Sequence, residues 1–208
     1  MTRTLVRYRC EACGHDSPKW LGRCPHCGEW GSFADGPAPT THGGPVCTAV
    51  PIAEVDALGA AHMATGIAEL DRVLGGGLVP GSVTLLGGEP GMGKSTLLLQ
   101  ALGAMASGGV RCLLVTAEES VAQVRVRAGR LGTLAPDLFV VSDTSLPAIA
   151  AHLDSIAPAV CVIDSIQAVH DPDGPGSPGS VTQVRDGAQV VVRLAKERGV
   201  AVLVVGHV

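Results

Sequence analysis

The segment GEPGMGKS, from Gly88 to Ser95, has residue types and spacing suited to binding phosphate groups. It fits the pattern G-x-x-x-x-G-K-[ST], in which backbone N–H groups of a Gly-rich turn surround phosphate oxygens. Lys94 is expected to reach the β- and γ-phosphates, and Ser95 to ligate Mg²⁺. The glycines allow the tight turn. We therefore predict a nucleotide site made of Gly88, Glu89, Pro90, Gly91, Met92, Gly93, Lys94, Ser95 and Thr96.

Further side chains that could complete a catalytic site lie at the ends of apolar runs. Asp164 ends the run VCVID, where a phosphate-loop protein carries its second magnesium-orienting carboxylate. Glu118 follows RCLLVT and is placed to orient and polarise an attacking water. The helix dipole alone also favours acidic residues at this position, and we prefer that interpretation for Glu119. His207, at the end of the last apolar run, could sense the γ-phosphate.

Near the N-terminus, two C-x-x-C pairs are formed by Cys10, Cys13, Cys24 and Cys27. Four thiolates suit tetrahedral Zn²⁺ and leave no open position for chemistry. Metal binding would supply most of the folding free energy of so short a segment. A redox role is the alternative, although redox motifs rarely come in facing pairs. His15 and His26 could replace a ligand, but we expect them to be exposed neighbours.

The elements that must position these side chains follow from alternating strand and helix patterns. Strands are predicted over residues 82–87, 111–116, 138–142, 160–164 and 200–205. Helices are predicted from Thr96 onward and over residues 120–131, 146–156 and 181–198, with Ser120 as a cap. This alternation predicts an α/β fold with a parallel sheet, helices on both faces and strands buried on both sides. Cys112 and Cys161 would be core residues, whereas Cys47 has no partner at ligand spacing.

Composition divides the chain into a four-cysteine module over 1–33, a Pro/Gly-rich linker over 34–62 and a nucleotide-binding core over 63–208. The triple glycine 75–77 is either a flexible hinge or a close-packed approach to the first strand of the core. Residues 171–180 are predicted to form a mobile loop.

The net charge of −4 argues against a generally basic nucleic-acid binder, but the first 33 residues carry five Lys/Arg against three Asp/Glu. That module is the better candidate for contact with a polyanion. Its basic and aromatic residues could bind single-stranded DNA, or the tryptophans could pack against the cysteine turns: Arg7, Arg9, Lys19, Trp20, Arg23 and Trp30. The sequence lacks a long apolar segment or a signal peptide, so we expect a cytoplasmic protein without membrane contact.

Taken together, these motifs resemble the bacterial RadA/Sms family of DNA repair and recombination proteins, relatives of RecA. The resemblance covers CGHDSPKWLGRCPHCGEW, TGIAELDRVLGGGLVPGS, the phosphate loop, AEES, VIDSIQ, GSVTQVRD and the final VGHV. The segment TGIAELDRVLGGGLVPGS and the phosphate loop alone would also fit KaiC-like or archaeal recombinase ATPases. The four-cysteine module in front of them removes most of that ambiguity.

The resemblance implies a RecA-like phosphate-loop core behind a zinc-ribbon-like module. It implies a homo-hexameric, DNA-dependent ATPase on single-stranded DNA, a helicase-type motor that acts alongside RecA in the branch migration of recombination intermediates. The implied cofactors are ATP, Mg²⁺ and structural Zn²⁺. The family's loop Lys and Ser fall on Lys94 and Ser95, its strand-end Asp on Asp164, its catalytic Glu on Glu118 and its γ-phosphate sensor on His207.

The family pattern continues past VGHV, so the resemblance also implies that this chain is C-terminally truncated and its sheet incomplete. An unpaired apolar sheet edge would follow, and these residues alone would bind nucleotide weakly, aggregate and not translocate on DNA. Soluble expression with full activity would refute that hypothesis. The alternative function is a nucleotide-switched zinc-ribbon adaptor, related to KaiC-like ATPases, that binds DNA or protein without motor activity.

Overall fold

The computed structural model describes residues 8–17, 19–35, 49–55, 61–174 and 179–207. The chain divides into two compact units, Met1–Val55 and Asp56–Val208, and each is described by itself. Much of the predicted linker lies outside the described residues, as do Arg7 and Cys47.

The N-terminal unit contains a three-stranded antiparallel sheet in the order β2-β1-β3. Strand β1 (Tyr8–Cys10) pairs with both β2 (Asp16–Ser17) and β3 (Phe33–Asp35). The buried residues here are Cys10, Cys24 and Phe33, with Tyr8 and Leu21 packed against them. A short 3-10 helix, η1 (Ile52–Glu54), belongs to the same unit. Such a small apolar cluster agrees with a module whose stability depends on metal.

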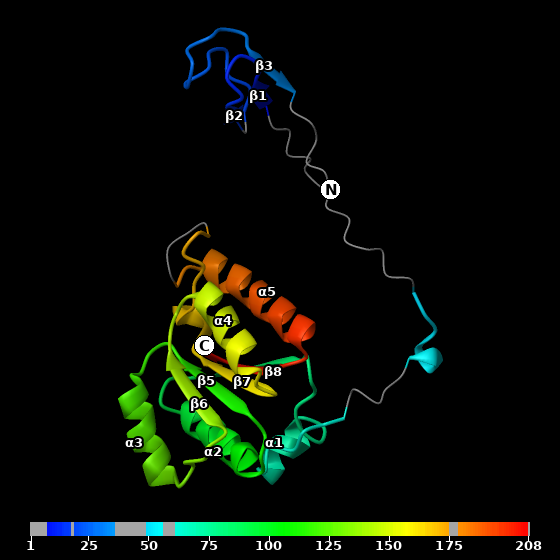
Figure 1. Ribbon diagram of the computed structural model, residues 1–208, viewed down its shortest axis with the longest axis vertical. Coiled ribbons are helices and arrows are strands. Elements are labelled where there is room, and N and C mark those ends of the chain that lie inside the picture. The colour runs from blue at the N-terminus through cyan, green and yellow to red at the C-terminus, as the bar shows by residue number, and fades with distance from the viewer. Residues whose placement is uncertain (1–7, 18, 36–48, 56–60, 175–178, 208) are drawn as a thin grey trace. The chain divides into compact units, whose positions relative to one another are not determined.

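The larger unit is built on a five-stranded parallel sheet in the order β4-β8-β7-β5-β6 (Figure 1). Its strands along the chain are β4 (Val83–Gly88), β5 (Cys112–Thr116), β6 (Leu138–Ser142), β7 (Val160–Asp164) and β8 (Ala201–His207). Its helices are α1 (Ala68–Val73), α2 (Lys94–Ser107), α3 (Val121–Leu131), α4 (Leu146–Ile156), η3 (Ile166–Ala168) and α5 (Val181–Arg198). The predicted α/β fold is confirmed.

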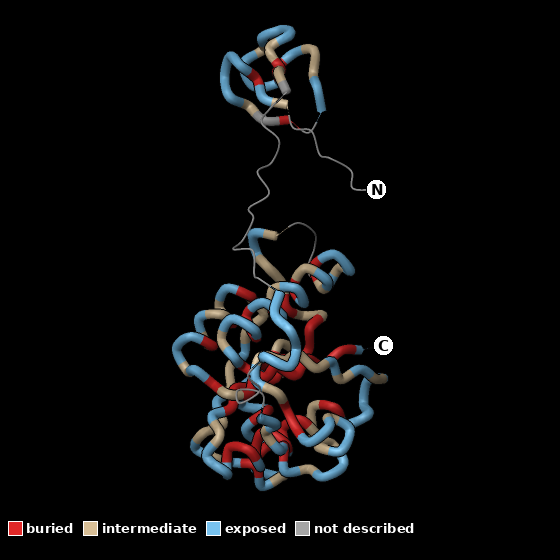
Figure 2. The backbone as a smooth tube through the Cα atoms, turned by 90° about the vertical axis from the view of Figure 1, so that its right-hand side faces the viewer, coloured by how far each residue is buried: buried red, intermediate tan, exposed pale blue. Residues whose placement is uncertain are grey.

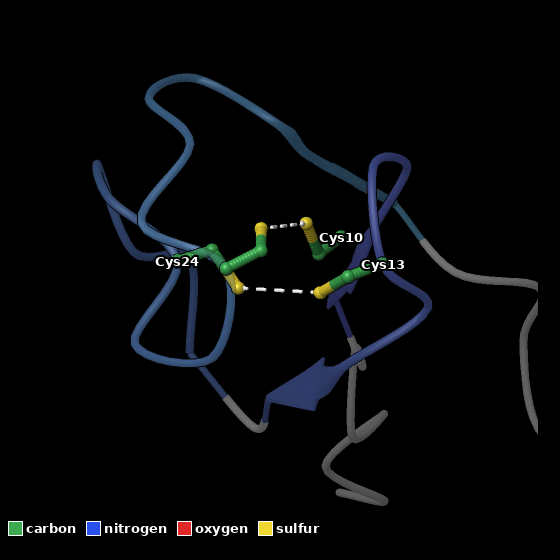
Figure 3. A group of neighbouring side chains, drawn as sticks. Cys10, Cys13 and Cys24 are labelled. Carbon is green, nitrogen blue, oxygen red and sulfur yellow. Dashed lines mark hydrogen bonds between the residues drawn. The ribbon is translucent and has the colours of Figure 1, made fainter.

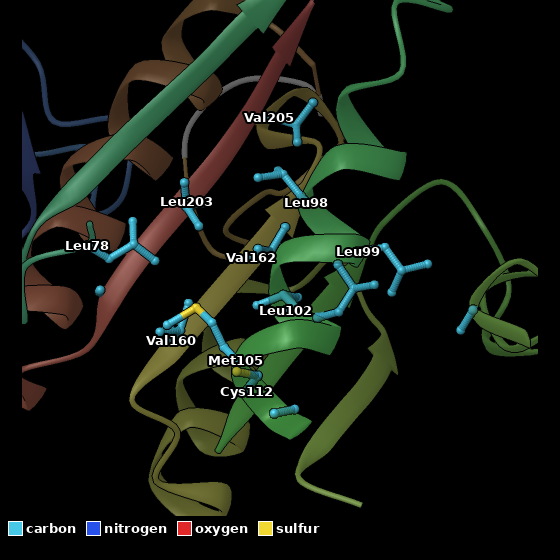
Figure 4. Packing of buried hydrophobic residues seen from close by; sticks show 14 of the residues in the cluster. Leu78, Leu98, Leu99, Leu102, Met105, Cys112, Val160, Val162, Leu203 and Val205 are labelled. Carbon is cyan, nitrogen blue, oxygen red and sulfur yellow. The ribbon is translucent and has the colours of Figure 1, made fainter. Parts of the chain in front are cut away.

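Alternate residues of the central strands face two separate apolar layers. One layer joins Cys112, Val162 and Leu203 to residues of α2 and α3, and Figure 4 shows Leu98 and Leu102 of α2 against the strands. The other layer includes the strand residues that alternate with these and point to the opposite face of the sheet, together with residues of α4 and α5. Helices therefore cover both faces, and Figure 2 shows the buried segments gathered in the interior of this unit.

The prediction of strands buried on both sides holds for β5, β7 and β8 but is wrong for the two edge strands. In β4, Leu85 is 66% exposed, and in β6, Phe139 is 39% exposed. An edge strand has a neighbour on one side only, so its outer side chains lie beyond the cover of the helices. The apolar run before the phosphate loop is thus an edge strand rather than a buried one.

Local sequence signals explain where the helices begin. The Ser120 hydroxyl accepts from the Gln123 backbone N–H, and the Gln123 side chain accepts from the Ser120 N–H, which forms the capping box of α3. The predicted cap is confirmed. Ser180 accepts from the Gln183 N–H in the same way at the start of α5.

Of the three glycines only Gly77 is closely packed, and its close neighbour differs from the one predicted. Gly77 has a φ of 132°, and a Cβ there would lie 2.2 Å from the Met63 carbonyl oxygen. Met63 and Leu78 exchange two backbone hydrogen bonds of 2.8 Å, which fix this approach. The contact is with the chain at Met63, not with the first strand of the sheet.

Candidate nucleotide and metal sites

The four cysteine sulfurs of the N-terminal unit gather in one group, in which all lie within 4.8 Å of one another (Figure 3). The Sγ atoms of Cys10 and Cys27 are 3.7 Å apart, and those of Cys13 and Cys24 are 3.6 Å apart. Sulfurs about 2.3 Å from a tetrahedral zinc would be about 3.8 Å from one another. The two measured distances therefore fit a Zn²⁺ ion held by the four thiolates.

Two matching turns bring the sulfurs together. Gly14 and Gly28 adopt φ values of 75° and 77°, and their N–H groups donate to the carbonyls of Cys10 and Cys24. The Ser32 hydroxyl, 3.1 Å from the Cys10 sulfur, and the nearby backbone amides lower the pKa of that thiol to about 6. Such contacts favour the thiolate, which is the form that binds metal.

The two histidines beside the cysteines lie outside the four-sulfur group. His15 and His26 stack on each other with ring centroids 5.8 Å apart, and His26 is exposed. The four thiolates alone complete a tetrahedral ligand set.

Both tryptophans of the N-terminal unit are largely in solvent. Trp20 is 56% exposed and Trp30 is 73% exposed. The Trp20 Nε1–H donates to the Phe33 carbonyl at 3.2 Å, and the Arg23 guanidinium lies 5.7 Å from the Trp30 ring centroid. The interpretation that both rings are packed away against the cysteine turns does not fit these exposures.

The phosphate loop joins the end of β4 to the start of α2. Gly91 and Gly93 have φ values of 81° and 84°, which a residue with a Cβ rarely adopts. The Lys94 ammonium lies across the loop and donates to the carbonyls of Gly88 at 2.7 Å and Glu89 at 2.8 Å. A pocket of about 220 Å³ opens at the helix start and is lined by Gly91, Gly93, Lys94, Ser95, Thr96, Arg127 and His207.

The strand register explains how distant residues reach this edge of the sheet. Gly88 lies opposite His207, and Thr116 lies opposite Asp164. Carboxyl ends of parallel strands meet at one edge, where α/β proteins bind their ligands. Glu118 follows two residues after Thr116, so both predicted carboxylates and the predicted sensor lie at the same edge.

Two of these residues are in direct contact. The Glu118 Oε1 atom accepts from the Ser165 hydroxyl at 2.5 Å and lies 3.3 Å from the His207 Nε2 atom. Asp164, at the end of β7, is partly buried. Within the described part of the chain, neither Asp164 nor Glu118 lines the phosphate-loop pocket, and Met92 is 73% exposed.

Sequence analysis missed two side chains at this edge. Ser165 follows Asp164 directly, and its place at a strand end was the available signal. Arg127 lies on α3, where nothing in the pattern separates it from the exposed Arg125 and Arg130. Glu119, assigned to the helix N-terminus alone, forms two contacts of 2.9 Å with the Arg127 guanidinium.

Among the helices that the structure describes, none combines the length and the apolar character that a membrane-spanning helix needs.

Comparison with known proteins gives two family matches. Residues 49–208 match the AAA domain model, and residues 8–35 match a rubredoxin metal binding domain. Several curated relatives carry the name DNA repair protein RadA. Those of Listeria monocytogenes and Mycobacterium tuberculosis are 40% and 42% identical, over 99% and 100% of this chain. These alignments cover 47% and 45% of the relatives, so the chain spans about half the length of the curated relatives it matches.

Proposed function

This chain belongs to the RadA family and contains an AAA domain behind a four-cysteine zinc-binding module, and from that premise we propose that it acts as a DNA-dependent ATPase. The proposed motor couples ATP hydrolysis to translocation on single-stranded DNA and to branch migration during DNA repair and recombination. It works in the cytoplasm as a homo-hexamer, alongside a RecA recombinase. The observation that carries the proposal is the position of the phosphate-loop pocket. It lies at the same edge of the sheet as Glu118 and His207, which are in contact with each other.

The loop residues bind and orient the nucleotide. The Lys94 ammonium, now satisfied by two loop carbonyls, exchanges them for phosphate oxygens. Ser95 and Asp164 are the residues that would hold Mg²⁺, which neutralises phosphate charge when bound. The backbone N–H groups at the start of α2 would donate hydrogen bonds to the phosphates, and the positive end of the helix dipole would attract the phosphate charge.

Glu118 is the proposed general base. One of its oxygens is held by Ser165, and the carboxylate accepts a proton from the attacking water. His207 contacts the same carboxylate and ends β8, so it couples the state of the site to the sheet.

The zinc module contributes contacts to DNA in this proposal. Exposed Trp20 and Trp30, with Arg23 beside the second ring, suit the stacking of unpaired bases. The same exposure also favours the second candidate, an adaptor that uses the nucleotide only as a switch. Trp20→Ala should weaken binding to single-stranded DNA while zinc stays bound, and unchanged affinity would show that the Trp20 ring does not contact DNA.

The test is ATP hydrolysis with and without single-stranded DNA at two salt concentrations. The motor predicts stimulation by DNA that weakens with salt, because phosphate contacts release counterions. Lys94→Ala should abolish turnover and leave zinc content unchanged. Tight ATP binding without stimulated turnover would favour the adaptor, and hydrolysis that survives Lys94→Ala would refute the site.

A further inference from the structure

Arg127 lines the phosphate-loop pocket although it belongs to no part of the phosphate-loop motif. It comes from the middle of α3 and shares the pocket with Lys94, Ser95 and His207. Among the residues that line this pocket there is no carboxylate. The pocket thus presents two cationic side chains beside the start of α2, a combination that favours an anion.

The guanidinium of Arg127 is held in a fixed orientation. Its two terminal nitrogens contact the two carboxylate oxygens of Glu119, each at 2.9 Å. The backbone of Glu119 is itself anchored, since its N–H donates to the hydroxyl of buried Thr116 and its carbonyl accepts from the same hydroxyl. Because the Arg127 side chain is already held by Glu119, it loses little further conformational freedom when it binds a ligand.

The ion pair leaves donors of Arg127 available. A guanidinium carries five N–H groups, of which a two-point contact with a carboxylate uses two. The Nε atom is buried and has no hydrogen-bond partner among the described residues. A buried donor without a partner is unfavourable unless a ligand supplies the acceptor.

We propose that Arg127 binds a phosphate group of the nucleotide in the same subunit, with Glu119 as the residue that positions it. The planar guanidinium suits two-point contact with phosphate oxygens, and a phosphate would supply an acceptor for the unused N–H groups. The inference rests on the proposed nucleotide site and adds to it a contact that no phosphate-loop pattern contains.

The test compares the affinity of the full chain for Mg·ATP and Mg·ADP in four variants. Arg127→Ala should weaken the binding of at least one of them by roughly 10- to 100-fold, the range for hydrogen bonds to charged groups. Arg127→Lys keeps the charge but loses the two-point contact, so its loss should be smaller. Glu119→Gln leaves the cation in place and should weaken binding only a few-fold. Arg130→Ala is the matched control, because Arg130 is exposed on the same helix and does not line the pocket.

A purely structural role for the ion pair gives a different pattern. Arg127→Ala and Glu119→Gln would then lower the melting temperature alike and leave both affinities unchanged, which would overturn the inference. Wild-type protein and Lys94→Ala separate this failure from failure of the nucleotide site. Suppose that wild-type protein binds nucleotide, that Lys94→Ala no longer binds it, and that Arg127→Ala binds it as tightly as wild type. Only the role of Arg127 is then refuted. If wild-type protein binds neither nucleotide, the proposed function fails with it.

Discussion

Ser165 donates a 2.5 Å hydrogen bond to Glu118 and so joins the end of β7 to the segment after β5. Ser165 is fully buried, so its hydroxyl has a fixed position from which to hold the carboxylate. The other contact of the same oxygen is His207 at 3.3 Å, from the end of β8. Three strand ends are therefore linked through one carboxylate oxygen.

Ser165→Ala is expected to lower kcat for ATP about 10-fold, because Glu118 loses a charge-assisted hydrogen bond that orients it. KM should change little, since Ser165 does not line the phosphate-loop pocket. Steady-state kinetics with single-stranded DNA give both values. Ser155→Ala on α4 is the control, because Ser155 is exposed. A variant with wild-type kcat would show that Ser165 has no part in positioning Glu118, the proposed base.

Cys13→Ser should release the metal and unfold the N-terminal unit, because the small cluster around Phe33 cannot hold it alone. The thermal transition of the larger unit should remain, since its two apolar layers contain no residue of the first unit. Zinc stoichiometry and calorimetry measure these effects. Cys161→Ala should do the reverse, with zinc retained and the larger unit destabilised. Full zinc occupancy in Cys13→Ser would contradict the four-thiolate site.

Gly77→Ala is expected to destabilise the larger unit by about 2–4 kcal/mol, because its Cβ would overlap the Met63 carbonyl and its φ is unfavourable for alanine. Gly75→Ala provides the comparison. Its φ is also positive, at 70°, but nothing lies within 4 Å of the added Cβ, so the loss should be nearer 1 kcal/mol. Urea unfolding distinguishes the two, and equal losses would mean that the close approach to Met63 is unimportant.

Asp71 should make the stability of the larger unit depend on pH in the acid range. The Thr65 backbone N–H, and then the Thr65 hydroxyl, donate to its carboxylate at 2.7 Å and lower its pKa. A carboxyl whose folded pKa is depressed stabilises the protein above its unfolded pKa of about 3.9. That stabilisation is lost as the pH falls through the lower folded value.

Asp71→Asn removes the titrating group, so thermal melts of this variant should vary less with pH below about 4 than those of wild-type protein. Asp71→Ala also leaves the buried Thr65 N–H without its acceptor and should be the less stable of the two at neutral pH. Identical pH profiles for wild-type protein and Asp71→Asn would rule out this linkage.

The sequence predicted most element boundaries of the larger unit because local signals mark them. The strands over 138–142 and 160–164 and the helices over 146–156 and 181–198 were predicted with the bounds observed. Lateral strand order has no such local signal. The position of β8 between β4 and β7 is set by packing, and with it the exposure of Leu85 at the edge.

In the candidate site, too, local patterns predicted some residues, whereas the place of others depends on how the chain packs. Lys94, Ser95 and the four cysteines belong to spacing patterns and could be predicted as ligand-binding residues. The contact between Glu118 and His207 joins positions far apart in the chain and follows from the sheet register. Arg127 could not be distinguished from its neighbours on α3, because its role depends on which pocket the helix borders.

Cys112 and Cys161 lie on neighbouring strands yet face opposite apolar layers, and burial raises the pKa of each thiol to about 12. Neither is accessible to an alkylating reagent or an oxidant while the larger unit is folded. Among the described cysteines, only those of the zinc module are open to such chemistry, since Cys13 and Cys27 are exposed. Among the described cysteines, oxidation of the native protein should therefore begin at Cys13 and Cys27 and spare Cys112 and Cys161 of the larger unit.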